Sequence, residues 1–453
     1  MGVYLLIIVG ATTAVTGAAD ACPTWPACNG QWLVPFSEPD LVVAWGHRVA
    51  ALLVGFLVVA AAAAAWLGDA ERRVRLAATV SLVLYPVQIV LGAVAATAAT
   101  TAALSAIHLT VGVVIFGGIV VALAWTLETE TANDPDWDPM PEPEPVDVES
   151  ADSPRPVPTG GIARAKLILS SYFRMMKPRL MWLLCLVAGA AMALGAATTG
   201  TDLSIETIVL TLLGGVLSIG ASGTFNHVLE RDVDRRMQRT SDRPLAVDVI
   251  PVTHALAFGF FLVAASLFVF GLVNLLVAAL GLVAIVFYSI IYTLVLKPNY
   301  ASNTVLGGAA GALPALIGSA AVDGAIGLPG AMLALVIFLW TPAHFYNLAL
   351  AYKDDYARGG FPMLPVVRGE ALTRKHIVWY LAATLVAAST LSAVADLGLL
   401  FALVSVALGG VFLWTVVKLH REQTEAAAFR AFHASNAYLG ALLAAVVVDS
   451  LVI

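Results

Sequence analysis

The sequence is poor in charged residues: Asp, Glu, Lys and Arg together make up only 12% of its 453 positions. Soluble domains carry about twice that share, so the composition excludes an ordinary soluble protein. A net charge of -6 provides no basic surface for nucleic acid, and we expect no nucleic-acid partner. Hydrophobic residues make up 60%, and the mean hydropathy is +0.89. Long apolar runs without strand-like alternation exclude a membrane β-barrel and predict an all-α polytopic membrane protein in the lipid bilayer.

One segment has almost no apolar residues. Between Glu128 and Pro156 the chain is acidic and rich in proline, so it cannot bury a core. We expect a disordered, solvated spacer without a binding role. It divides the sequence into a membrane domain at 1–127, a linker at 128–162 and a larger membrane domain at 163–453.

Hydropathy windows predict a four-helix transmembrane bundle followed by a nine-helix domain. The candidate spans of the first domain lie at about 3–20, 41–67, 76–97 and 104–126. Those of the second lie at about 171–197, 206–229, 252–272, 274–295, 303–321, 328–351, 376–396, 398–418 and 430–450. No basic segment precedes the first span, so we expect a retained helix rather than a cleaved signal peptide.

The basic breaks between spans share one side of the membrane if the N-terminus also lies there. These breaks are ERRVR at 71–75, RDVDRRMQR at 231–239, two segments within 353–375 and KLHRE at 418–422. The positive-inside rule makes this side cytoplasmic. We therefore predict a multi-pass protein of the cell membrane, with its N-terminus, linker and charged motifs on the cytoplasmic side.

Cysteine is scarce, with three residues in the whole chain. The predicted exterior segment 22–39 contains Cys22 and Cys28, which can form a disulfide because the exterior is oxidising. Cys185 lies in an apolar span and is predicted to fill space in the core.

The stretch NHVLERDVDRRMQRTSDRPLA, 226–246, places charged side chains directly after an apolar span. If the helix continues, Asn226, Glu230 and Asp234 lie on one face, because residues four apart are stacked there. Such oxygen ligands suit Mg²⁺, which is held by a few carboxylates together with substrate phosphates. Asp232 lies off this face and could contribute only where the helix unwinds.

The same stretch repeats arginine every four residues, and guanidinium groups suit phosphate oxygens. These arginines are Arg231, Arg235, Arg239 and Arg243. The alternative is a salt-bridged helix end that only anchors the span at the membrane surface.

A second acidic cluster, YKDDYARGGFPMLP at 352–365, follows a span on the same predicted side and contains Lys353, Asp354 and Asp355. Two such clusters could hold metal ions that bridge a diphosphate, while an attached apolar chain lies among the helices. Loss of diphosphate assisted by Mg²⁺ and arginine would leave an allylic cation.

Both motifs resemble those of the UbiA superfamily of intramembrane prenyltransferases, most closely its protoheme IX farnesyltransferases, or heme O synthases. Further stretches that resemble this subgroup are KPRLMWLL from Lys177, LKPNYASNTVLGGAAGALPALIGSAA from Leu296 and WTPAHFYNLALAYKDDY from Trp340. The resemblance covers nearly all of 165–453 and implies the family's nine-helix architecture.

The resemblance also implies roles for individual residues. The acidic motifs of the catalytic site would comprise Asn226, Asp232 and Asp234 in the first and Asp354 and Asp355 in the second. The cations on the diphosphate side would be Lys177, Arg239, Arg243 and Lys297. The sequence departs from the family at Glu230, where Asp is usual, and after Lys297, where PNY replaces a basic pair.

The implied reaction transfers a farnesyl group from farnesyl diphosphate to a vinyl group of protoheme IX, or heme B, and water completes the hydroxyethylfarnesyl group. His344 and Tyr346 precede the second motif and could contact the porphyrin, or equally be core polar residues. The alternatives are a UbiA-type transferase acting on a quinone or lipid precursor and a non-enzymatic heme carrier. No repeat typical of carriers is visible in the sequence.

The small domain resembles one half of the heme A synthase family, whose members contain two four-helix halves. The resemblance rests on CPTWPACNGQWLVP from Cys22, GHRVAALLVG around His47 and SAIHLTVGVVIFG around His108. Two histidines on separate helices could be axial ligands of a heme in the bundle. Ala44 stands where the family commonly has Glu. The domain could dimerise, bind heme without turnover or present heme to the fused partner, with heme A synthase or oxidase assembly proteins as expected partners.

Overall fold

The computed structural model describes residues 1–15, 17–98, 101–131 and 160–452. Twelve helices in this part of the chain are long and apolar enough to cross a membrane, three before the linker and nine after it. Most of the predicted linker, 132–159, lies outside the described residues. The all-α membrane class predicted from composition is confirmed.

The N-terminal domain is a bundle of α1 (Gly2–Val15), α2 (Pro39–Leu67), α3 (Arg72–Thr97) and α4 (Ala102–Thr131). Neighbouring helices pack in a cycle, α1 on α2, α2 on α3, α3 on α4 and α4 on α1, so α2 and α4 occupy opposite corners. The first expected span is too long, because α1 ends at Val15. Its 14 residues extend over about 21 Å, less than the roughly 30 Å of a bilayer core.

The larger domain contains nine long helical segments joined by short helices and loops. The long segments are α6 (Pro178–Thr199), α7 (Ile205–Leu229), α9 (Val252–Val273), α10 (Leu275–Val286) continued by the π-helix η3 (Phe287–Leu296) and α11 (Lys297–Asn299), α12 (Asn303–Asp323), α13 (Leu328–Ala351), α16 (Glu370–Val394), α17 (Leu399–Glu422) and α18 (Glu425–Val452). The short helices are α8 (Arg231–Asp234), α14 (Lys353–Arg358) and α15 (Leu364–Arg368).

The span expected to begin at residue 171 begins at Pro178 instead. Lys177 has a left-handed backbone (φ 57°), which separates α6 from the residues before it. The proline that follows also disfavours right-handed helical geometry at this residue. The preceding residues form a separate helix, α5 (Gly161–Met175), whose exposed Ile162 and Leu169 lie on a helix that also carries basic residues. Such an amphipathic helix is suited to the membrane surface.

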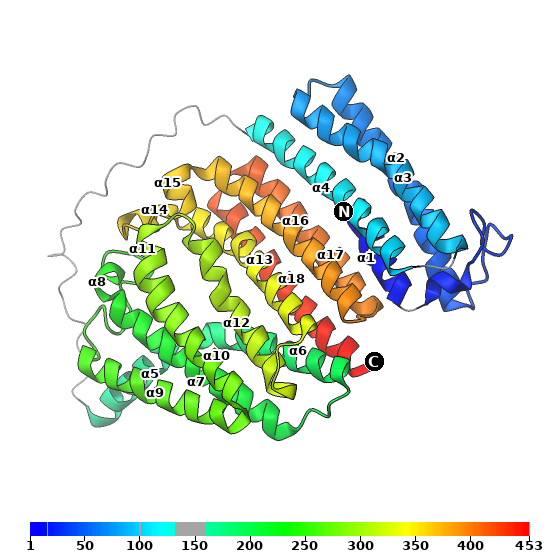
Figure 1. Ribbon diagram of the computed structural model, residues 1–453. Coiled ribbons are helices and arrows are strands. Elements are labelled where there is room, and N and C mark those ends of the chain that lie inside the picture. Colours follow the sequence, from blue (N-terminus) through cyan, green and yellow to red (C-terminus); the bar gives the residue numbers. More distant parts are fainter. Residues whose placement is uncertain (16, 99–100, 132–159, 453) are drawn as a thin grey trace.

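The two domains pack directly against each other. Figure 1 shows α1 and α4 beside α16 and α17 of the larger domain. Tyr4 and Ser405 share a buried hydrogen bond of 2.5 Å at this contact. At one end of α4, Glu128 accepts a 2.6 Å ion pair from Lys375. The predicted basic break at Arg73 also reaches Glu128, so several of the breaks do lie at one end of the molecule.

Candidate functional site

The first acidic motif lies where α7 ends. Asn226, Glu230 and Asp234 are all buried there. Glu230 leaves α-helical geometry (φ -98°, ψ 6°) and separates α7 from α8, yet backbone hydrogen bonds continue across it. The Asp234 N–H donates to the Glu230 carbonyl at 2.7 Å, and the Glu230 N–H donates to the Asn226 carbonyl at 2.9 Å. The side chains of Asn226, Glu230 and Asp234 therefore stay on the same side of the chain, as the four-residue spacing predicted.

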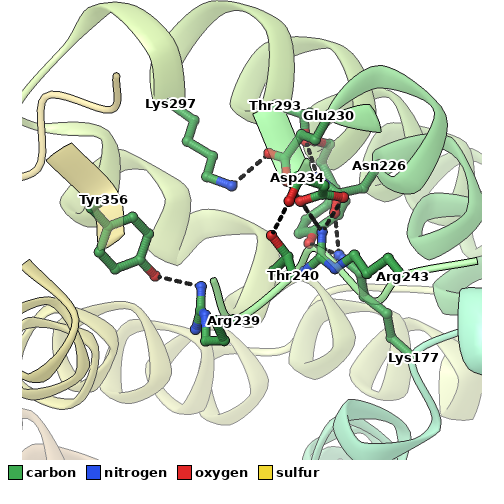
Figure 2. Close-up of polar contacts among 11 residues, drawn as sticks. Lys177, Asn226, Glu230, Asp234, Arg239, Thr240, Arg243, Thr293, Lys297 and Tyr356 are labelled. Carbon is green, nitrogen blue, oxygen red and sulfur yellow. Dashed lines mark hydrogen bonds and ion pairs between the residues drawn. The ribbon is translucent and has the colours of Figure 1, made fainter. Parts of the chain in front are cut away.

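Each of these three side chains accepts a hydrogen bond from a cation. Lys177 donates to Asn226 Oδ1, Lys297 donates to Glu230 at 2.5 Å, and Arg243 donates to both Asp234 oxygens at 2.8 Å. Arg243 also lies 3.7 Å from Glu230. Figure 2 shows the cations converging from different parts of the chain on the end of α7. The predicted diphosphate-side cations Lys177, Arg243 and Lys297 are thus brought together with the predicted metal ligands.

Lys177 reaches the cluster because α7 carries glycine at the contact. A Cβ added to Gly223 would lie 2.6 Å from the Met175 carbonyl oxygen, so only glycine lets the turn at Met175–Lys177 approach α7 this closely. The Lys177 ammonium also donates to the Tyr288 hydroxyl at 3.0 Å. The turn therefore holds one cation between the acidic motif and the apolar helices.

Burial and neighbouring charges shift the titration of this cluster. Burial, reinforced by Arg243, lowers the pKa of Lys177 to about 7, although Glu230 opposes the shift. Burial alone would raise the pKa of Glu230, but Lys297 and Lys177 outweigh it and hold that pKa below its usual range. Burial raises the pKa of Asp234 even though Arg243 opposes the change. Lys177 is thus the cation whose charge is most easily changed near neutral pH.

The π-helix η3 contributes two residues that the sequence did not reveal. Thr293 accepts a 3.3 Å hydrogen bond from the Asn226 amide and donates at 2.8 Å to the Tyr288 carbonyl, five residues earlier. Tyr288 itself bonds Lys177. A π-helix turns more widely than an α-helix, so periodicity could not have placed these side chains on the face toward α7.

The second acidic motif holds the loop that follows α8. Asp355 is buried and accepts from the backbone N–H groups of Gln238 (2.7 Å) and Arg239 (3.2 Å) and from Arg358 (2.9 Å). Arg239 donates to the Tyr356 hydroxyl at 3.1 Å (Figure 2). Tyr356 was not assigned a role from the sequence. The two motifs are connected through this loop, which also carries Arg243.

Other predicted site residues lie elsewhere. Asp232, with 87% of its side chain exposed, and Asp354 face outward. Arg231 and Arg235 pair with Asp248, and Lys353 pairs with Glu370. The arginines that repeat every four residues do not share one helix face, because helical geometry ends at Asp234.

The two side chains considered for the porphyrin lie in aromatic packing. The His344 ring stacks between Trp340 (4.2 Å) and Phe432 (4.4 Å), and its Nδ1 lies 2.7 Å from the Ser435 hydroxyl. Tyr346 is 2% exposed. These contacts favour the interpretation as core residues, while the porphyrin role stays a prediction.

An apolar cavity begins beside the charged cluster. Lys177 and Tyr288 line one end, and Thr211, Leu212 and Phe270 line the other. Its walls come from α6, α7, α9, α10, η3 and α12. A charged end that opens into an apolar cavity suits a molecule with an anionic head and a long apolar tail.

The acidic motif suits Mg²⁺ only together with a ligand. Among the described residues no group of three or more His, Cys, Asp and Glu side chains could hold a metal ion alone. Mg²⁺ keeps several waters and is commonly held by one or two carboxylates plus substrate phosphates. Glu230, Asp234 and the Asn226 amide oxygen provide that kind of incomplete set.

The small domain places His47 on α2 and His108 on α4, at opposite corners of the bundle. The Nδ1 atom of each ring is buried without a hydrogen-bond partner among the described residues. Gln88, which the sequence did not single out, lies 3.2 Å from His108 Nε2. Buried imidazole nitrogens that lack a hydrogen-bond partner inside a four-helix bundle suit the role of axial ligands to a heme iron.

The loop that precedes α2 is closed by a disulfide between Cys22 and Cys28. Arg48, one residue after His47, donates to the Cys22 carbonyl at 2.6 Å and to the Thr24 carbonyl at 2.5 Å. Ala44 is buried with the two cysteines. The loop is therefore tied to the helix that carries His47, through a residue that the sequence analysis did not find.

Fold and site together define a membrane-embedded transferase of the prenyl diphosphate class. Residues 182–440, more than half of the chain, match the model of the UbiA prenyltransferase family, and residues 1–145 match that of a cytochrome oxidase assembly protein family, COX15-CtaA. The chain belongs to the UbiA prenyltransferase family.

Its relatives carry a specific name. The chain is 63% identical over 453 residues to the protoheme IX farnesyltransferase of Haloarcula marismortui, covering all of this chain and 96% of that protein. It is 60% identical over 455 residues to the protein of the same name from Halobacterium salinarum, with both chains fully covered. The protein of that name from Parafrankia is 41% identical over 308 residues, which cover 66% of this chain and 96% of that protein.

Among solved structures, one that concerns digeranylgeranylglyceryl phosphate synthase in membranes superposes with a TM-score of 0.52 at 15% identity. The match covers 63% of this chain and 99% of that one. At this identity the similarity shows a common fold alone.

The charge of Lys177 should control anion binding near neutral pH. Because its pKa is about 7, the free protein loses this cation as the pH rises from 6 to 8. Arginine keeps its charge over this interval, so only the wild-type protein loses affinity for inorganic pyrophosphate on this account. We expect the ratio of the Lys177→Arg affinity to the wild-type affinity to rise about tenfold from pH 6 to pH 8. Calorimetry on detergent-solubilised protein measures both affinities, and the ratio cancels the titration of pyrophosphate itself. A constant ratio would contradict the assignment.

Proposed function

We propose that this chain is a protoheme IX farnesyltransferase that converts heme B and farnesyl diphosphate to heme O. The observation that carries the proposal is the place of Lys177, which belongs both to the charged cluster and to the wall of the apolar cavity. A diphosphate bound at that cluster would leave its tail in the cavity. The names of relatives that align over the whole chain support the same reaction.

The residues of the cluster have complementary roles in this proposal. Lys177, Arg243 and Lys297 bind diphosphate oxygens, and Arg239 extends this cationic surface. Asn226, Glu230 and Asp234 hold Mg²⁺, which when bound neutralises charge on the departing diphosphate. When the diphosphate binds, these cations exchange their carboxylate partners for phosphate oxygens. Their positive charge then lies where negative charge develops on the departing diphosphate.

The outlying predicted residues receive roles consistent with their contacts. Asp355 fixes the loop that carries Arg239 and Arg243, and with the exposed Asp354 and Asp232 it stays a predicted metal-side residue. Arg231 and Arg235 shape the loop through Asp248. Lys353, His344 and Tyr346 remain predicted contacts of the substrates. We assign the charged end of the bundle to the cytoplasmic side by the positive-inside rule. The N-terminus was expected at that end, but Met1 lies beside Gly409 and Gly410, midway along α17.

The small domain is proposed to bind a heme through His47 and His108. Their buried, unpartnered ring nitrogens support this role, and the match to a cytochrome oxidase assembly family agrees with it. Ala44 leaves the domain without the carboxyl usual at that position, so the proposed role is heme binding, and heme A formation stays a prediction. Heme A synthase and oxidase assembly proteins are the partners that such a domain would serve.

Membranes containing this chain should form heme O. With heme B, farnesyl diphosphate and Mg²⁺ supplied, mass spectrometry should detect the hydroxyethylfarnesyl heme. Asp234→Asn should reduce the rate by about a hundredfold or more, since it removes one charge from the centre of the cluster. The control is Asp242→Asn, a change in the same loop at a half-exposed carboxylate that pairs with Arg174.

Absence of the heme O mass, with a known synthase active in parallel, would exclude this reaction. A prenylated quinone or lipid formed from the same diphosphate would instead support the alternative acceptor. Full activity of Asp234→Asn would remove the cluster from the reaction.

Replacing His47 should lower the heme content of the protein while heme O formation by the larger domain continues. His47→Ala should remove most of the heme absorbance that co-purifies with the protein, because the iron loses an axial ligand. Heme O formation should fall less than about twofold, since His47 lies in the other domain. The control is His254→Ala, at an exposed position at the start of α9. Unchanged heme content in His47→Ala would contradict the assignment.

A further inference from the structure

The apolar cavity runs along α7 from the charged cluster toward the opposite end of the bundle. On this helix it is lined by Gly223 near Lys177 and by Thr211 at the far end. A helix rises 1.5 Å per residue, so these two positions lie about 18 Å apart. The depth of this cavity limits the length of any chain that enters from the charged end.

Phe270 of α9 forms a wall of the far part of the cavity, where its ring lies at the depth of Gly214 of α7. Its side chain is fully buried and lies between two other helices that carry glycine at the contact. A Cβ at Gly214 of α7 or at Gly281 of α10 would lie 2.5 Å from a ring carbon of Phe270. The ring also belongs to an apolar cluster with Met192, Val277 and Ile317. Phe270 is therefore a fixed wall rather than a mobile side chain.

One wall position between the two ends is open. Gly215 of α7 lines the cavity, and a Cβ built there meets no atom within 4 Å. It lies eight residues from Gly223, or about 12 Å along the helix. A larger side chain at this position would project into the cavity from a Cβ that displaces no neighbour.

We propose that Phe270 and the space beside Gly215 determine which prenyl chain length the enzyme accepts. Four main-chain bonds of about 1.5 Å in zigzag give each isoprene unit a length of about 5 Å. Three units fill about 15 Å and fit the 18 Å between Gly223 and Thr211, whereas a fourth would extend past Thr211, along the fixed ring of Phe270 and into the apolar cluster around it. This inference rests on the proposed function, because it assumes that the tail of the diphosphate substrate occupies the cavity.

The test compares geranyl, farnesyl and geranylgeranyl diphosphate with heme B as acceptor. Gly215→Leu should raise the ratio of kcat/KM for geranyl over farnesyl diphosphate at least tenfold, since two units still fit below the block. The matched control is Gly271→Leu on α9, where an added Cβ also meets no atom within 4 Å but the residue does not line the cavity. This control should keep the wild-type ratio.

The opposite change should lengthen the accepted chain. Phe270→Ala should raise kcat/KM for geranylgeranyl relative to farnesyl diphosphate at least tenfold, whereas Phe268→Ala, on the exposed side of the same helix, should not. If Phe270→Ala does not fold, Gly215→Leu decides alone. A Gly215→Leu protein that is active with the wild-type preference overturns the inference. Wild-type protein that transfers none of the three chains overturns the proposed function instead.

Discussion

Charged groups at the end of an apolar helix bundle must be paired, and the rest of the site depends on this constraint. A lone cation or carboxylate would lose hydration without compensation, so Lys297 pairs with Glu230 and Arg243 with Asp234. Lys297 of α11 lies 67 residues from Glu230, whereas Arg243 and Asp234 are nine residues apart. The two pairs therefore join α11 and the loop after α8 to the end of α7 (Figure 2). The same pairs keep the cations in place before an anion arrives, so binding requires an exchange of partners and no large rearrangement.

The fold and half of the site could be predicted, for identifiable reasons. The four-residue spacing of Asn226, Glu230 and Asp234 survives because backbone hydrogen bonds continue across the break at Glu230. The four-residue spacing of the arginines does not place them on one face, because the chain turns after Asp234. This turn brings Asp248 to Arg235, with which it forms an ion pair. Local periodicity describes a helix well and a loop not at all.

The remaining residues depend on contacts over long sequence distances. Tyr288 and Thr293 face Asn226 because η3 is a π-helix, and no pattern in the apolar run signals that change of register. The His344 ring stacks in the core against Phe432, which lies nearly ninety residues further along the chain. The break at Lys177 was visible in principle, because proline follows it, but the apolar run on both sides concealed it.

The contact of α1 and α4 with α16 and α17 determines which helices of the larger domain the small domain covers. The small domain lies beside α16 and α17, whereas the walls of the tail cavity are α6, α7, α9, α10, η3 and α12 (Figure 1). The fused domain therefore leaves the cavity helices facing the lipid, where a diphosphate with an apolar tail is dissolved. The covalent connection keeps the two domains at a high local concentration, and the small domain does not cover the cavity helices.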